Sequence, residues 1–125
     1  MIGTTRQVRV FVYREPVDMR KAYDSLSALV TGHLQKTLTS GDLFAFIGKT
    51  RKRAKVLYFD GTGLCLFAKR LVTGHFAAPW IRPGSGPIEL TMSELALLIE
   101  GSDLVMRARL SPEVYTPRGT PSSAA

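Results

Sequence analysis

The sequence predicts a single α+β domain with a largely antiparallel sheet of three to five strands and two amphipathic helices on one face. The hydrophobic period changes from two over residues 8–13 to three and four after Asp18. Three short apolar runs separated by turn residues follow between positions 43 and 67, and a second amphipathic run closes the pattern. The predicted order is therefore strand, helix, three strands, a short further strand and a second helix.

The first two elements follow from this change of period. Val8, Val10 and Val12 alternate with other residues, and Pro16 ends the run, as is typical of a strand. We expect Asp18 to cap the helix that follows and Gly32 to close it. Its apolar face would consist of Met19, Ala22, Tyr23, Leu26, Leu29 and Val30.

The middle of the chain predicts three strands. An apolar run at 43–47 is followed by a basic segment, which we interpret as a charged loop at 49–55, and by a second run at 56–59. Residues 60–63 read Asp-Gly-Thr-Gly and tolerate positive φ, so a tight hairpin should lead into a third strand at 64–67.

The last elements are a short edge strand at 88–90 and a helix. Thr91 and Glu94 have the spacing of a capping box, and Gly101 fits the position after the helix. Residues 78–87 are rich in Pro and Gly and should be irregular. We expect a flexible N-terminus at 1–6, one domain over 7–110, and a disordered tail over 111–125.

Positive charge is concentrated in one segment. Residues 44–82 contain eight Lys or Arg and a single acid, Asp60, a net charge of 8 − 1 = +7, which equals the net charge of the 125-residue chain. This suggests a polyanionic partner, although a solvated hairpin tip is the structural alternative. The candidate nucleic-acid-binding residues are Lys49, Arg51, Lys52, Arg53, Lys55, Lys69 and Arg70, extended by Arg20 and Lys21 at the start of the first helix.

Two functions are compatible with this charge. The basic region could bind DNA or RNA. Nearby aromatic rings could stack on bases, although at strand spacing such rings are more typical of a core. These rings are Tyr58, Phe59, Phe67 and Trp80. The alternative is a protein-protein adaptor whose basic loop meets an acidic surface.

The sequence offers no catalytic site. The carboxylates that could hold Mg²⁺ each have a local structural role, and they are Asp18, Asp24, Asp60 and Asp103. His33 and His75 do not have the spacing of metal ligands to each other or to Cys65. The surroundings of Cys65 in the sequence are more typical of a buried structural thiol. We therefore predict no enzyme activity, no metal and no cofactor.

The chain also lacks the marks of export or membrane insertion. Its N-terminus has no continuous apolar region of a signal peptide, and no apolar run is long enough to span a bilayer. A single cysteine cannot form an internal disulfide. We expect a cytoplasmic protein without membrane partners, associated with the nucleoid when bound to DNA.

Four motifs in order resemble one known family. They are Pro16-Val17-Asp18-Met19-Arg20-Lys21 with Asp24 and Leu26, the run from Val56 through Asp60-Gly61 to Leu66, Lys69-Arg70-Leu71, and Leu90-Thr91 with 95–103. The chain thereby resembles the TnpB-type (Orf-two-like) accessory proteins of the IS-sixty-six group of bacterial insertion sequences, which are unrelated to the RNA-guided nuclease of that name. Phe59, Ser25 and Ala68 depart from the pattern, where Trp, Gly and an aromatic residue are usual.

The resemblance implies a role in transposition beside a separate transposase of the DDE type. With the charge pattern, it predicts a non-enzymatic accessory protein whose partners are DNA and the transposase of the same element. It leaves open the choice between DNA and RNA, sequence specificity, the step assisted and homo-oligomerisation.

Overall fold

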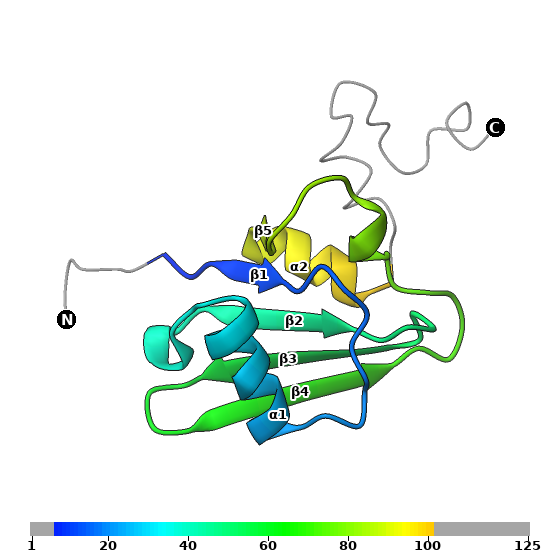
Figure 1. The fold of residues 1–125 in the computed structure, drawn as a ribbon. Helices are drawn as coiled ribbons and strands as arrows, with labels where there is room; N and C mark the ends of the chain where they lie inside the picture. The colour runs from blue at the N-terminus through cyan, green and yellow to red at the C-terminus, as the bar shows by residue number, and fades with distance from the viewer. Residues whose placement is uncertain (1–6, 102–125) are drawn as a thin grey trace.

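The structure is a computed structural model and describes residues 7–101 (Figure 1). Its five strands form one sheet in the order β4-β3-β2-β1-β5. The strands are β1 (Val10–Val12), β2 (Leu43–Ile47), β3 (Arg53–Phe59), β4 (Leu64–Arg70) and β5 (Ile88–Leu90). The predicted α+β class and the predicted order of elements are confirmed.

The sheet is mixed but mainly antiparallel. Strand β1 is parallel to β2, because the chain crosses over through a helix between them. The pairs β2–β3, β3–β4 and β1–β5 are antiparallel. This arrangement puts β4 and β5 at the two edges.

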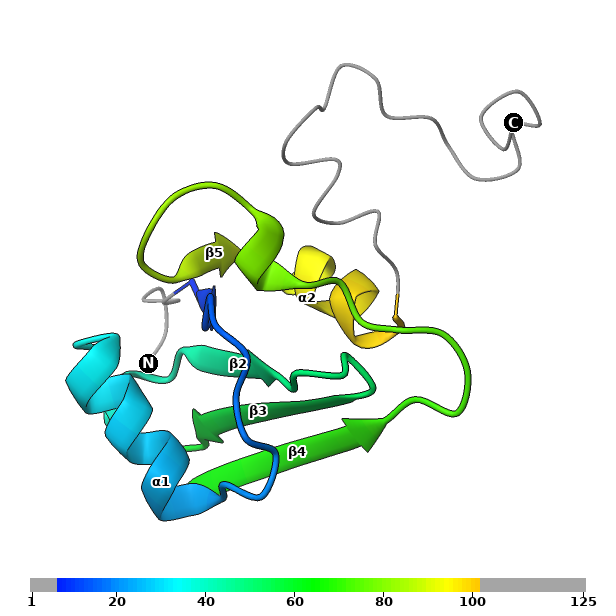
Figure 2. The same ribbon diagram turned by 45° about the vertical axis from the view of Figure 1, so that its right-hand side comes forward.

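The prediction that both helices lie on one face is wrong. Helix α1 (Tyr23–Ala28), which continues as a π-helical turn over Leu29–His33, packs on one face, and α2 (Met92–Ile99) packs on the other (Figures 1 and 2). The cause is visible in β2, where the residues from Phe44 to Ile47 are all buried. A strand buried on both faces needs a covering layer on each side.

Two apolar clusters result from the alternation of side chains. Val10 and Val12 point toward α2 and pack with its Leu95 and Leu98. Phe11, between the two valines, points the other way and packs with Leu26 of α1. The core is therefore divided by the sheet into two halves.

Helix α1 begins later than predicted. Asp18 does not cap it, since its carboxylate accepts from the amide of Arg20, 2.9 Å away, within a turn that precedes the helix. The amide of Ala22 donates instead to Ser25 Oγ at the true N-terminus. Gly32 lies inside the final π turn rather than after it.

Several local predictions are confirmed. Asp60 Oδ1 accepts from the amides of Thr62 and Gly63 in the β3–β4 turn. Thr91 and Glu94 form the predicted capping box. Residues 78–87 are irregular apart from a 3₁₀ turn at Pro79–Ile81, and a second 3₁₀ turn occupies Leu38–Ser40.

The basic loop is shorter than predicted. Strand β3 begins at Arg53, so Arg53 and Lys55 belong to the sheet, and only residues 48–52 form the β2–β3 turn. The predicted termini at 1–6 and 111–125 lie outside the described residues, and the predicted domain range of 7–110 stays a prediction.

Candidate nucleic-acid interface

The β2–β3 turn has a fixed backbone. The amide of Arg51 donates to Gly48 O, and the amide of Gly48 donates to Arg53 O, both at 2.9 Å. Arg51 adopts φ of 60°, the left-handed conformation that the tight turn requires. The carbonyl of Arg51 also accepts from the amide of Phe76, 2.8 Å away. The turn is thus anchored to the 71–76 segment as well as to the two strands.

Beside this turn lies a groove, which we call the basic groove. It consists of two adjoining hollows that share Met19 and Arg53, the larger with a volume of about 630 Å³. Residues 16–20 form one wall, and the turn with β3 and β4 forms the other. The cations that line the groove are Arg20, Lys49, Arg53, Lys55, Lys69 and Arg70.

Two of these cations are direct cross-strand neighbours. Arg53 of β3 pairs with Arg70 of β4. The amide of Leu71 donates to Lys52 O one position further along. Arg53 and Arg70 therefore form a non-hydrogen-bonded pair, the type in which side chains approach most closely. Like charges placed this way destabilise a sheet.

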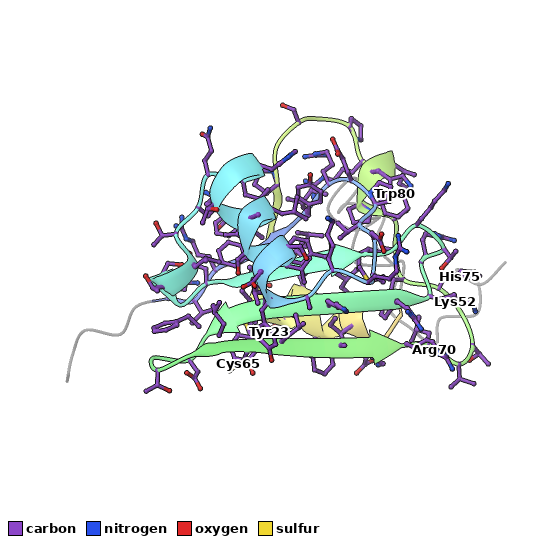
Figure 3. The ribbon with its side chains drawn as sticks, turned by 60° about the horizontal axis from the view of Figure 1, so that its bottom comes forward. Tyr23, Lys52, Cys65, Arg70, His75 and Trp80 are labelled. Carbon is purple, nitrogen blue, oxygen red and sulfur yellow. The ribbon has the colours of Figure 1, made fainter. Side chains whose placement is uncertain are left out.

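No acid within residues 7–101 forms an ion pair with Lys49, Arg53 or Arg70. All three side chains are exposed. Figure 3 shows Arg70 at the same end of the sheet as Lys52 and His75. Among the described residues, this end of the sheet therefore presents positive charge that no acid pairs with.

Arg20 differs from these cations because Asp18 holds it. Arg20 Nη2 lies 2.7 Å from Asp18 Oδ2, and Arg20 Nε lies 3.0 Å from Oδ1. The hydrogen bonds from the Arg20 side chain, followed by the one from its amide, keep the pKa of Asp18 well below its usual range. Arg20 reaches the groove with its charge already paired.

Three predicted lysines donate to backbone carbonyls. Lys52 Nζ lies 2.8 Å from Gly74 O, and Lys55 Nζ lies 2.7 Å from the carbonyl oxygen of Lys21. Lys69 Nζ lies 2.9 Å from Ile99 O at the C-terminal end of α2, where a positive charge is favourable. Lys55 thereby connects β3 to the segment that follows the 16–20 wall, and Lys21 contributes its carbonyl rather than its amine to this contact.

The aromatic rings predicted as candidates for base stacking do not line the basic groove. Tyr58 and Phe67 line an apolar hollow on the α2 face with Met92 and Leu95. Trp80 packs against the core on that side. Of the residues that line the basic groove, none is aromatic. The geometry therefore supplies charge for phosphates but no ring for stacking on bases.

Sequence reasoning missed the apolar floor of the groove. Met19 was predicted on the apolar face of α1, yet it lies before the helix and lines both hollows. A Cβ added to Gly48 would lie 2.7 Å from Met19 Cγ, so the methionine rests on the glycine. The glycine before the basic run was the available clue to a close approach.

Cys65 is half-buried rather than fully buried. Burial, followed by its hydrogen bond with Asp60, raises the pKa of the Cys65 thiol. Within residues 7–101, no three His, Cys, Asp or Glu side chains gather in a way that could hold a metal ion. None of the helices in this part of the chain has the length and apolar character to cross a membrane.

Comparison with known proteins places the chain in a family. Residues 8–109 match the family model described as IS66 Orf2 like protein. The chain is 36% identical over 103 residues to uncharacterized protein y4jC of Sinorhizobium fredii (strain NBRC 101917 / NGR234), covering 82% of this chain and 86% of the relative. Uncharacterized protein y4hO of the same strain is 35% identical over 103 residues, covering 82% of this chain and 88% of the relative.

No solved structure matches the chain. The family match covers most of the chain and includes the basic groove from residue 16 to residue 70. The chain belongs to the IS66 Orf2-like family, and membership implies a role in the transposition of an insertion sequence.

Proposed function

We propose that this protein is a non-enzymatic accessory factor in transposition that binds nucleic-acid phosphates in the basic groove. The observation that carries the proposal is the opposed pair of Arg53 and Arg70. A bound phosphate between the two guanidinium groups would convert their repulsion into two favourable charge-assisted contacts. Lys49 is exposed on the neighbouring turn and extends the cationic surface.

The expected strength follows from the number of unpaired cations that line the groove. Lys49, Arg53 and Arg70 would neutralise three phosphates, which gives a slope of about −2.7 per groove in log affinity against log salt on duplex DNA. Five contacts from the whole 49–55 run would give about −4.5. The smaller value is expected because Lys52 and Lys55 already donate to backbone carbonyls.

The groove favours contact with the phosphate backbone over readout of bases. Phosphate contacts fix position without reading sequence, and the residues that line the groove include no aromatic ring. We therefore expect similar affinity for element-end DNA and for random DNA of equal length.

Fluorescence anisotropy with element-end DNA, random DNA and RNA tests the proposal. The test variant carries Arg53→Gln and Arg70→Gln. The control carries Gln7→Glu and Thr39→Glu, which change the net charge equally at exposed positions outside the groove. The groove variant should flatten the salt slope by about 1.8 for each groove that is engaged. If both variants lose the same affinity, the effect is one of net charge and the groove is not the site.

A pull-down with the transposase separates the adaptor function from direct binding. If wild-type protein binds the transposase but binds no nucleic acid at low salt, the protein is an adaptor and does not contact phosphates directly. Loss of DNA binding in the groove variant with the transposase still captured would support direct contact.

A further inference from the structure

The two edges of the sheet differ in how they are protected. Strand β5 is three residues long, follows Pro87 and carries the exposed Glu89, all features that discourage pairing with another chain. Strand β4 has seven residues, and its first five are uncharged and mostly apolar. Only Lys69 and Arg70 at its far end carry charge. The β4 edge is therefore open to another strand.

The backbone of β4 has unused hydrogen-bonding groups. The amide of Asp60 donates to Gly63 O, and the amide of Leu71 donates to Lys52 O. Between these two positions, hydrogen-bonded and non-hydrogen-bonded pairs alternate along the β3–β4 ladder. By that alternation, the amides and carbonyls of Leu66 and Ala68 point away from β3. Within residues 7–101, neither residue makes a backbone hydrogen bond outside the sheet. These groups are available to a partner strand.

Apolar side chains continue this open edge on the α2 face. Phe67 is 43% exposed, and Met92 of α2, which lines the same hollow, is 48% exposed. Large apolar side chains that adjoin unpaired backbone groups are typical of an interaction surface. The surface lies on the opposite face of the sheet from the basic groove.

We propose that β4 pairs in antiparallel orientation with β4 of a second copy, which joins two five-stranded sheets into one. A two-fold axis at Leu66 places Leu66 opposite Leu66 of the second copy and Leu64 opposite Ala68. Every residue of the 64–68 run then faces an uncharged residue. The 64–68 run can therefore pair with an antiparallel copy of itself without placing a charged residue opposite any of its residues.

Charge supports a second copy as the occupant. In this register, Lys69 and Arg70 lie beside the 60–63 turn of the second copy. That turn carries the exposed carboxylate of Asp60, whose pKa is lowered to about 2 chiefly by hydrogen bonds from the amides of Thr62 and Gly63. The cations of one copy thus meet an anion of the other at both ends of the interface, and no two Arg70 side chains face each other.

The dimer would place both basic grooves on one face. Residues opposite each other in a sheet point to the same side, so Arg70 of both copies would share the α1 face. Eight residues along the strand would separate these two arginines, which corresponds to about 27 Å. One nucleic acid could then contact both grooves and gain from bivalent binding, a consequence that rests on the proposed function.

Sedimentation over a range of protein concentrations tests the pairing. Ala68→Pro removes an amide that the monomer does not use, and Phe67→Lys places a charge on the edge. Leu97→Lys is the matched control, because it adds the same charge at an exposed position of α2 that does not line this hollow. We expect wild type and the control to dimerise, and both edge variants to raise the dimer dissociation constant at least about tenfold, with folding confirmed by circular dichroism.

Disulfide trapping tests the register. In the proposed pairing, residue 67 lies opposite Cys65 of the second copy in a closely spaced pair. Phe67→Cys should therefore form a covalent dimer with oxidised glutathione, and Phe67→Cys with Cys65→Ser should not.

The two proposals fail in distinguishable ways. A wild-type protein that stays monomeric at every concentration, or edge variants that dimerise as wild type does, would overturn the pairing. Dimers that form normally but bind no nucleic acid would overturn only the proposed function. Monomeric edge variants that bind DNA more weakly than wild type, but with half its salt slope, would support both.

Discussion

Arg53 and Arg70 face each other across β3 and β4 as a non-hydrogen-bonded pair of like charges. Both side chains are exposed, and the repulsion exists in the folded state only. Natural sheets favour opposite charges at such positions. Such a pair is expected to lower the stability of the protein, and under the proposed function a bound phosphate would offset that repulsion.

The first prediction concerns the charge of this pair. Arg53→Glu should increase the free energy of unfolding by roughly 0.5 kcal/mol, because it replaces a repulsive cross-strand pair by an attractive one. Urea denaturation at low salt measures the change. Arg70→Glu should act in the same direction, and the double variant should lose the gain because two carboxylates then face each other.

The same substitution should weaken nucleic-acid binding. A variant that is more stable yet binds less tightly separates a functional role of the arginines from a structural one. If Arg53→Glu lowers stability and leaves affinity unchanged, the repulsion between the two guanidinium groups is not significant and the pair is an ordinary solvated surface.

The second prediction concerns Asp18, which pairs with Arg20 at the wall of the groove. Asp18→Asn removes the negative charge and frees Arg20 for a phosphate. We expect tighter binding of duplex DNA and a salt slope steeper by about 0.9, which corresponds to one added phosphate contact. Fluorescence anisotropy at several salt concentrations measures both. Arg20→Gln in the same background should cancel the gain, and a gain that persists would show that Arg20 is not the group released.

Local interactions explain which elements the sequence predicted well. The 60–63 turn and the Thr91–Glu94 capping box are each made by residues within three positions of each other, so their residue types suffice to predict them. The start of α1 was misplaced because Asp18 forms a turn of its own with Arg20, and the same residue type serves both motifs.

Long-range contacts explain what the sequence left undetermined. The helices were predicted on one face, although the continuous apolar run of β2 already indicated burial on both. The groove depends on Met19 and Arg53, which are far apart in the chain and meet only through the topology. The individual cations were predicted, but nothing local distinguished Arg53 and Arg70 from lysines that donate to backbone carbonyls.

The third prediction concerns pH. The pKa of Asp60 is lowered to about 2, first by hydrogen bonds from the amides of Thr62 and Gly63. Because the folded pKa is below the unfolded value, the stabilisation is fully present above about pH 4 and is lost as the pH falls toward 2. The difference in the free energy of unfolding between wild type and Asp60→Asn should therefore become smaller as the pH falls over this range. NMR titration of the Asp60 carboxyl carbon checks the pKa directly, and a midpoint near 4 would contradict the prediction.

The fourth prediction concerns the contact beneath the groove. A Cβ at Gly48 would lie 2.7 Å from Met19 Cγ and 3.5 Å from Arg53 O. Gly48→Ala should destabilise the protein by about 1 to 3 kcal/mol, because the methionine must shift from the position it packs in. Met19→Ala should cost less in the Gly48→Ala background than in wild type, since it removes the atom that clashes. Thermal unfolding of the four proteins of this cycle measures the coupling, and purely additive effects would show that the glycine is required for a reason other than its contact with Met19.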